Sequence, residues 1–483
     1  MSGNISQPLL IPSTERLLRG MITALDGIDS EGRADIRHVV GMLRLVVQHL
    51  IRRESLADFV SIHSEIISLV KESADLLDLP IDGGLPSSVS GTFDDIQQAV
   101  GQALDQLNKI AAQVDPLDKG FWRKTQDVER RFYAALLPVA VIESRCAPIS
   151  ITSQRFETYL RSRFNNQYIG LKSFTKLVGG FQKETILVEA LKADNSVDAV
   201  VVRAEKNDRF LKHTASEIDD EFEIVRLMWN AGIPVAEPLW IERDASALGS
   251  RFMVSRRAPG ENAGNAVGSA SKFSRDLTQS FLTNLVGIHN IKVDDSVAIT
   301  KLIRWMGHKT LADNTRAAID YWRNQSWLAT APASVTFSRV FKWLEDNVPA
   351  DDGKQCIVHN DFGPHNILVE SGKVTAILDW ENVRLGDPAD DLAYFIQCGG
   401  SAIDAEDVIK IYSDLGGQEI SNFRLKYFAV FSCAKVLAAT LSATTMYQST
   451  DPALIDWVQL PIAWHGMFQQ QVEEKILAAE ACR

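Results

Sequence analysis

Three polar side chains in the C-terminal half of the chain, Asp361, Asn366 and Asp379, have the types and order that a metal-assisted transfer reaction needs. Asp361 and Asn366 are five positions apart, and Asp379 follows a sequence typical of a hairpin that turns at Ser371 and Gly372. One loop and one hairpin can therefore hold a carboxylate against an attacking hydroxyl while an amide oxygen and a second carboxylate converge on Mg²⁺. The pattern predicts a hydroxyl-activating carboxylate beside a magnesium site.

The spacing of Asp361 and Asn366 is also that of the H-x-D-x-x-x-x-N catalytic loop of phosphoryl-transfer kinases. With one departure, residues 357–394 contain H-G-D-x-x-x-x-N, then I-D-W/F-E, then G-D-P-x-x-D-L, and so resemble the aminoglycoside phosphotransferase and choline kinase superfamily. By this resemblance Asp361 is the catalytic base, and Asn366 and Asp379 are the metal ligands. The same resemblance makes His359 the residue that holds the loop.

The one departure from the motif is Asn360, where the family has Gly. Asn also tolerates unusual backbone angles, so we expect the loop to keep its conformation. The simplest alternative is that Asp361 and Asn366 only make a turn before a strand, which is a common use of both residue types. Three matches at the right spacing favour the functional interpretation.

A glycine-containing segment upstream, LVGGFQKETILVEA at 177–190, resembles the hairpin of this family that lies over the nucleotide phosphates. Gly179 and Gly180 alone would indicate only a hairpin, but a strand with a basic residue, DAVVVRAEK, follows at the expected distance. In that strand Arg203 alternates with Val201, as the phosphate-binding lysine alternates with its small neighbour in V-A-I-K. The resemblance therefore implies that Arg203 binds phosphate, although a guanidinium is not interchangeable with an ammonium.

Glu221 lies in a helix predicted at 215–230, and the resemblance implies that its carboxylate pairs with Arg203 in the nucleotide site. The alternative is a solvated helix face, because five of the seven residues at 217–223 are acidic and most such charges face water. Both interpretations of Glu221 stay open from the sequence.

The remaining residues that match the family are expected to be structural. Residues 251–260 resemble the strand and connector that offer backbone groups to adenine, where side-chain identity matters little. His289 matches a helix-borne L-x-x-L-H and, on an apolar helical face, is expected to be a buried structural residue. Asp387 is predicted to cap a helix with proline at its first turn, and Asp390 and Asp391 are expected to be architectural.

The elements that must position these residues follow from hydrophobic periodicity. From Ser13 to about Ala147 apolar residues recur at helical spacing, for example at 36–53, and predict a helical bundle with further helices at 93–114 and 121–142. After Ala147 one helix precedes strand-like runs at 176–178, 185–189 and 199–203, and mainly helical sequence follows. We therefore predict an α+β fold, a two-lobed protein-kinase-like fold preceded by an all-α helical bundle domain. The predicted domains are 1–147 (helical bundle), 148–258 (N-lobe with a small antiparallel sheet and a helix) and 259–483 (mainly α C-lobe).

Composition narrows the class of protein. A chain of 483 residues with 46% hydrophobic and 23% charged residues has enough apolar sequence for two or three cores and is neither disordered nor membrane-resident as a whole. Its net charge of −12 argues against nucleic acid as the main ligand. The five cysteines are scattered without C-x-x-C spacing, so reduced and mostly buried thiols are expected. The first residues make a poor secretory signal, and we expect a cytoplasmic protein.

Together the motifs predict an ATP- and Mg²⁺-dependent phosphotransferase that phosphorylates a hydroxyl group of a small molecule. Arg203 in place of lysine and the N-terminal helical segment both resemble the acyl-CoA-associated branch of the family, which favours a hydroxyacyl-CoA as the acceptor. The alternatives are a kinase of aminoglycoside or macrolide antibiotics and a catalytically inactive nucleotide-binding module. The expected partners are the nucleotide and the small molecule, with no nucleic acid and no membrane; the oligomeric state and the choice between ATP and GTP stay open.

Overall fold

The structure is a computed structural model that describes residues 56–135, 151–449 and 464–483, apart from short gaps. The gaps are residues 78, 80, 82–88, 90–92, 115–117, 178–182, 207–216, 265–271, 294–295, 307–309, 326–327, 329–333 and 351–352. The helix predicted at 36–53 and the glycines Gly179 and Gly180 therefore lie outside the described residues.

Contacts divide the chain into two compact units. The first unit comprises Met1–Ala147, Ile319–Asn347 and Cys433–Ala481, and the second comprises Pro148–Ala318, Val348–Ser432 and Cys482–Arg483. The three predicted domains stay a prediction, whereas the two units record which segments pack together. Two segments that the sequence assigned to the C-lobe, 319–347 and 433–481, pack in the first unit.

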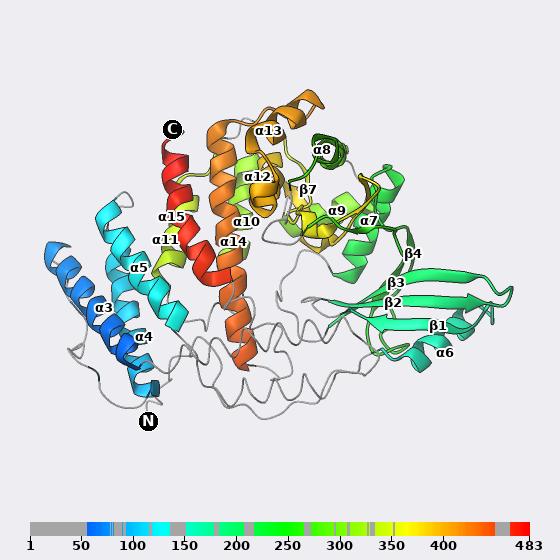
Figure 1. The fold of residues 1–483 in the computed structure, drawn as a ribbon, viewed down its shortest axis with the longest axis horizontal. Coiled ribbons are helices and arrows are strands. Elements are labelled where there is room, and N and C mark those ends of the chain that lie inside the picture. The colour runs from blue at the N-terminus through cyan, green and yellow to red at the C-terminus, as the bar shows by residue number, and fades with distance from the viewer. Residues whose placement is uncertain are drawn as a thin grey trace. The chain divides into compact units, whose positions relative to one another are not determined.

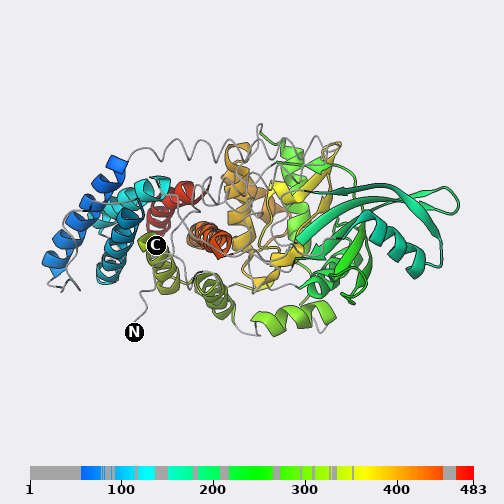
Figure 2. The ribbon, with the colours of Figure 1, turned by 90° about the horizontal axis from the view of Figure 1, so that it is seen from below.

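The described part of the first unit is helical (Figure 2). Its helices include α3 (Leu56–Leu77), α4 (Phe93–Ala111), α5 (Lys119–Ala135), α11 (Val335–Asp346) and α15 (Gly466–Glu480). Ile66 and Val70 of α3 and Val100 and Leu107 of α4 are fully buried. Because these apolar residues recur at helical spacing, each helix buries one face against its neighbours. The helices predicted at 93–114 and 121–142 are present, with described ends at Ala111 and Ala135.

A buried carboxylate joins α5 to the start of α11 in this unit. Glu129 is fully buried; its Oε1 accepts a hydrogen bond from Val335 N at 2.9 Å, and its Oε2 accepts one from Thr336 N at 3.0 Å. These N–H groups belong to the first turn of α11, where a helix offers no internal partner. Burial raises the pKa of Glu129, while the hydrogen bonds from α11 oppose that rise. Glu129 thus ties two helices that lie 206 positions apart in the sequence.

The second unit begins with a five-stranded antiparallel sheet in the order β1-β2-β3-β5-β4, with α6 (Ser153–Arg163) beside β1 (Figure 1). The strands are β1 (Tyr168–Lys176), β2 (Lys183–Lys192), β3 (Val197–Glu205), β4 (Pro238–Glu242) and β5 (Phe252–Arg256). Alternate residues Ile186 and Val188 of β2 pack with Phe156 of α6 in one core. The strand predicted at 176–178 was misplaced, because the observed strand β1 ends at Lys176. Strand β1 lies at the edge of the sheet, where the mixed exposure of its residues hides the alternation of apolar and polar side chains.

The second part of this unit is mainly helical, with two small sheets. Its helices include α7 (Ile218–Asn230), α8 (Arg275–His289), α9 (Val297–Met306), α12 (Pro388–Gly399) and α13 (Ala405–Asp414). Residues 311–318 of α10 (Leu311–Arg323) and residues 422–432 of α14 (Asn422–Ser449) also belong to it. Its strands are β6 (Glu261–Asn262), β7 (Cys356–Val358), β8 (Ile367–Glu370), β9 (Lys373–Ile377) and β10 (Arg384–Gly386). The turn between β8 and β9 has φ of +50° at Ser371 and +76° at Gly372, so the predicted hairpin is confirmed. A small antiparallel lobe, a mainly α lobe and an N-terminal helical region confirm the predicted α+β, kinase-like fold.

Helix α7 belongs to the C-lobe core by its packing. Its residues Ile224 and Met228 are fully buried in the cluster that contains Phe281 of α8 and Ile299 of α9. The start of the helix, through Ile218 and Phe222, forms a small cluster with Met253 of the sheet. Helix α7 therefore packs against both the larger core and the sheet.

Two further sequence predictions can be compared with the fold. Residues Asn422–Ala443 of α14 form a stretch of 22 residues that is long and apolar enough to cross a membrane, and 72% of its most apolar part is buried inside the fold, as a core helix would be. Cys356, Cys398 and Cys433 are buried free thiols, and Cys482 is a partly exposed one. The described cysteines thus match the expectation of reduced thiols.

Candidate active site

A cavity of about 510 Å³ lies in the second unit, between strands of the five-stranded sheet and the 359–366 loop that follows β7. Its walls combine apolar residues of β2, β3 and β5 with a few charged and amide side chains. Among the polar lining residues are Arg203, Glu221, Asn366 and Asp379. Four of the sequence-predicted site residues therefore meet at one cavity, and a volume of this size suits a small-molecule ligand.

The 359–366 loop places Asp361 against Asn366. The Nδ2 of Asn366 donates to the carboxylate Oδ2 of Asp361 at 2.9 Å and to its backbone oxygen at 3.0 Å. Because both amide hydrogens serve this purpose, the side-chain oxygen of Asn366 is the atom left for a ligand. The backbone of Asn366 also accepts a hydrogen bond from Leu378 N at 2.8 Å, which brings the loop next to Asp379.

His359 is fully buried beneath the loop. Its Nδ1 accepts from Asp361 N at 3.3 Å, which makes Nε2 the protonated nitrogen that donates to Leu378 O at 2.9 Å. The ring thus connects the backbone of Asp361 in the loop to Leu378, the residue before Asp379. The loop-holding role that the family resemblance implies for His359 stays a prediction.

A chain of buried polar groups supports the loop from below. Asp391 accepts hydrogen bonds from His359 N at 2.8 Å and from Asn360 N at 2.7 Å. His289 donates through Nε2 to Asp391 at 3.1 Å, and Tyr412 lies 2.8 Å from its other ring nitrogen. Asn360 has φ of +65°, the left-handed conformation that Asn tolerates better than other non-glycine residues. His289 and Asp391 are therefore architectural, as the sequence predicted.

Arg203 and Asp379 form a direct ion pair at the cavity. Arg203 Nη2 lies 2.8 Å from Asp379 Oδ1, and Nη1 lies 3.4 Å from Glu221 Oε1. Burial alone would raise the pKa of Asp379, but Arg203 outweighs burial and holds that pKa below its ordinary value. Glu221 is only 1% exposed, which decides against the solvated-face interpretation.

Two charged residues in this cluster were missed by sequence reasoning. Lys183 Nζ lies 2.7 Å from Glu221 Oε2 and 2.7 Å from Glu381 Oε2, and all three side chains are buried. Burial raises the pKa of Glu381 to about 7, although Lys183 opposes the rise. Alternation along β2 could have identified Lys183. Thr185 lines the cavity and is paired with Arg203 across the sheet, and Lys183, two residues away, has its side chain on the same face of the strand.

His365 is a third residue that the sequence did not single out. Its Nε2 lies 3.5 Å from Asp361 Oδ1. Burial lowers the pKa of His365, but the carboxylates of Asp361 and Asp379 outweigh burial and raise it. The ring packs so closely over Gly363 that a Cβ there would lie 2.5 Å from it, which explains glycine at this position.

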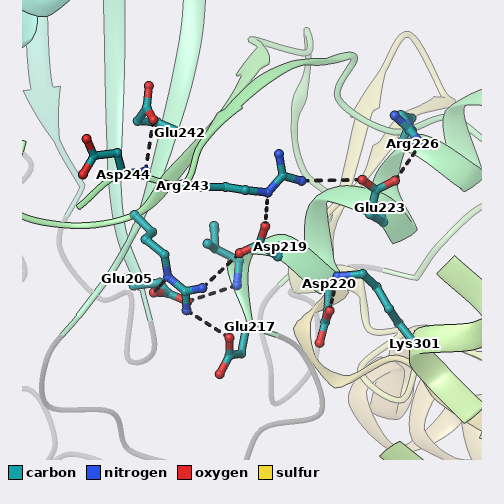
Figure 3. Close-up of polar contacts among 12 residues, drawn as sticks. Glu205, Glu217, Asp219, Asp220, Glu223, Arg226, Glu242, Arg243, Asp244 and Lys301 are labelled. Carbon is teal, nitrogen blue, oxygen red and sulfur yellow. Dashed lines mark hydrogen bonds and ion pairs between the residues drawn. The ribbon is translucent and has the colours of Figure 1, made fainter. Parts of the chain in front are cut away.

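The start of α7 is held by several ion pairs (Figure 3). Arg243 contacts Asp219 and Glu223, and Lys301 of α9 contacts Asp220. The same cluster includes Arg251, which pairs with Asp219 at 3.0 Å. These pairs, with the buried apolar face of α7, hold the helix that carries Glu221 in place.

Magnesium held with a nucleotide fits the residues present. Among the described residues, no group of three or more His, Cys, Asp or Glu side chains could hold a metal ion by itself. Mg²⁺ bound with phosphates needs only one or two protein oxygens, because phosphate and water supply the rest. Asn366 and Asp379 both line the cavity and offer such oxygens.

The nucleotide side of the cavity matches the resemblance in part. Ser255 and Ala258, in the segment expected to offer backbone groups to adenine, line the cavity. The expected phosphate hairpin at Gly179 and Gly180 lies outside the described residues. The catalytic, phosphate-binding and metal-binding roles of individual residues stay predictions.

Relatives of this chain include members of the acyl-CoA dehydrogenase family. Acyl-CoA dehydrogenase family member 11 of Gallus gallus is 29% identical over 189 residues, which cover 38% of this chain and 23% of that protein. Acyl-CoA dehydrogenase family member 10 of Mus musculus is 25% identical over 250 residues, which cover 51% of this chain and 22% of that protein. The chain thus spans less than a quarter of the length of these relatives.

Solved structures and a family model complete the comparison. Macrolide 2′-phosphotransferase MphH of Brachybacterium faecium is 18% identical, with a TM-score of 0.43 over 60% of this chain and 91% of that one. Spectinomycin phosphotransferase APH(9)-Ia, solved with ADP and spectinomycin, is 14% identical, with a TM-score of 0.46 over 69% and 98%. The family model matches residues 174–421, just over half of the chain and the whole cavity described above. The chain therefore belongs to the phosphotransferase enzyme family APH.

Proposed function

We propose that this chain is an ATP- and Mg²⁺-dependent phosphotransferase that phosphorylates a hydroxyl group of a small molecule. The observation that carries the proposal is the convergence of Arg203, Asn366 and Asp379 on one cavity, with Asp361 2.9 Å from Asn366. Phosphoryl transfer requires mainly positioning and charge neutralisation, and a carboxylate, an amide, a second carboxylate and a guanidinium provide both.

Each residue has a distinct task in the proposed reaction. Asp361 accepts the proton of the attacking hydroxyl, and the amide of Asn366 keeps that carboxylate in place. Arg203 binds phosphate oxygens, and Asn366 and Asp379 hold Mg²⁺. Bound Mg²⁺ supplies the positive charge that phosphate oxygens need during transfer.

For the acceptor we favour a hydroxyacyl-CoA. The relatives named acyl-CoA dehydrogenase family members 10 and 11 support this choice, because the matching region is part of proteins whose names refer to acyl-CoA. Binding of an acceptor that carries several phosphates should weaken steeply with added salt.

The test is an ATP-consumption assay with the full chain and a panel of hydroxyacyl-CoA thioesters, choline-like alcohols, aminoglycosides and macrolides. We expect turnover of a hydroxyacyl-CoA with a KM that rises with salt, and none in Asp361→Asn, which controls for contaminating ATPases. Turnover of an antibiotic and of no hydroxyacyl-CoA would overturn the acceptor but keep the phosphotransferase. A chain that neither binds Mg·ATP nor consumes ATP would contradict the whole proposal.

A further inference from the structure

Two cations on neighbouring strands share the same acidic side chains. Lys183 of β2 lies 2.7 Å from both Glu221 and Glu381. Arg203 of β3 lies farther from these two, at 3.4 and 3.6 Å, and is closest to Asp379 at 2.8 Å. Lys183 therefore makes the tighter pairs with the glutamates, and Arg203 makes the tighter pair with the aspartate.

The two cations also differ in access to the cavity. The side chain of Lys183 is 6% exposed and that of Arg203 is 19% exposed. Arg203, Glu221 and Asp379 are among the residues that line the cavity, whereas Lys183 and Glu381 are not. Within the described part of the chain, Arg203 Nε has no hydrogen-bond partner. Arg203 therefore lines the cavity and has an N–H group available for a ligand. Lys183 is more buried and does not line the cavity.

Charge explains why a second cation is needed. Three acidic side chains, Glu221, Asp379 and Glu381, share two cations, and a buried carboxylate without a partner is costly. Burial alone would lower the pKa of Lys183, but Glu221 and Glu381 outweigh burial and raise it, so the ammonium is charged at neutral pH. Without Lys183, the guanidinium of Arg203 would be the sole cation for all three carboxylates.

We propose that Lys183 is a positioning residue for Arg203: it holds Glu221 and Glu381, so that the guanidinium of Arg203 can pass from Asp379 to the nucleotide phosphates when Asp379 binds the metal. This inference rests on the proposed ATP-dependent function. In this arrangement Lys183 pairs with Glu221 of helix α7, and Arg203 contacts phosphate. Lys183 acts only through its neighbours and touches no reacting atom.

The experiment is calorimetric titration of the full chain with Mg·ATP. Lys183→Met should weaken binding about tenfold or more, because Glu221 and Glu381 then draw Arg203 away from the phosphates. Adding Glu381→Gln to Lys183→Met returns the cluster to the wild-type formal charge and should restore most of the affinity. Lys183→Arg, which keeps the positive charge, should retain more affinity than Lys183→Met.

Lys176→Met is the matched control. Lys176 lies on the adjacent strand β1 and pairs with Glu184, but its side chain is 38% exposed and, within the described residues, belongs to no buried cluster with Arg203. It should bind Mg·ATP like the wild type. Thermal unfolding of every variant reports folding, and if Lys183→Met alone does not fold, the charge-balanced double variant decides. Unchanged binding in Lys183→Met, or folded double and single variants that bind equally weakly, would overturn the inference. A wild-type chain that fails to bind Mg·ATP would instead overturn the proposed function and the inference with it.

Discussion

The two compact units of the chain use buried charged and polar side chains in different ways. In the first unit, Glu129 receives hydrogen bonds from the backbone at the start of α11 and so joins two helices. In the second unit, Lys183, Arg203 and Asp379 belong to a cluster of opposite charges at a cavity. A carboxylate that serves the backbone stabilises a fold, whereas paired charges at a cavity can exchange partners when a ligand arrives. Substitutions in the two units should therefore separate stability from ligand binding.

The largest effect is expected at Asp361. Asp361→Asn keeps the size of the side chain but removes the base, so turnover of the acceptor should fall about 10²- to 10⁴-fold. Affinity for Mg·ATP should stay near the wild-type value, because the nucleotide is held by other residues. Initial rates and calorimetric titration measure the two quantities, and full activity would sink the assignment of Asp361.

The next largest effect is expected at Asp379, in the affinity for Mg·ATP. Asp379→Ala should reduce that affinity about a hundredfold, or ~2.7 kcal/mol, because the metal loses its carboxylate. The backbone of Asp379 has φ of +66°, which Asn tolerates better than Ala, so Asp379→Asn separates the loss of charge from backbone strain. Equal Mg·ATP affinity in all three proteins would count against a metal role.

In the first unit, His465 should make stability depend on pH. Burial lowers its pKa from 6.5 to about 4, so the unfolded chain takes up a proton at a pH where the folded chain does not. The stability that neutral His465 contributes is present above pH 6.5 and is lost as the pH falls toward 4, by about 2 kcal/mol between pH 6.5 and 5. Urea unfolding at pH 6.5 and pH 5 should show a smaller loss of unfolding free energy in His465→Gln than in the wild type. The affinity of that variant for Mg·ATP should be unchanged. Equal losses would contradict the prediction.

The smallest effect is expected at Glu129. Glu129→Gln keeps one acceptor oxygen for the start of α11 but removes the second and the charge, and should lower the free energy of unfolding by about 1 kcal/mol. Affinity for Mg·ATP should not change, because Glu129 belongs to the first unit. If Glu129→Gln lost nucleotide binding but kept the wild-type stability, the proposed difference between the two units would be wrong.

Local spacing explains which parts of the site were predictable. Asp361 and Asn366 sit in one loop, so five positions of sequence suffice to bring them into contact. Arg203 was found by alternation with Val201 along one strand, and the same rule applied to β2 would have found Lys183. Glu381 lay inside the quoted I-D-W-E motif, but only the fold shows that it meets Lys183.

Long-range packing explains what the sequence did not predict. The segments 319–347 and 433–481 pack in the first unit, and their own helical patterns carry no information about that partner. Likewise, the acids at the start of α7 resemble a solvated face, and only the tertiary structure separates fully buried Glu221 from half-buried Asp219, Asp220 and Glu223. An amphipathic pattern identifies a buried face without identifying what buries it.

The two hydrogen bonds that Asp391 accepts from the 359–366 loop have a consequence for amide hydrogen exchange. The amide hydrogens of His359 and Asn360 both point to one buried carboxylate, so neither can exchange with solvent while the loop rests on α12. Their exchange rates therefore measure how often this loop lifts from its support. Two adjacent amides that exchange together would identify that opening as a single local event, observable without any substrate.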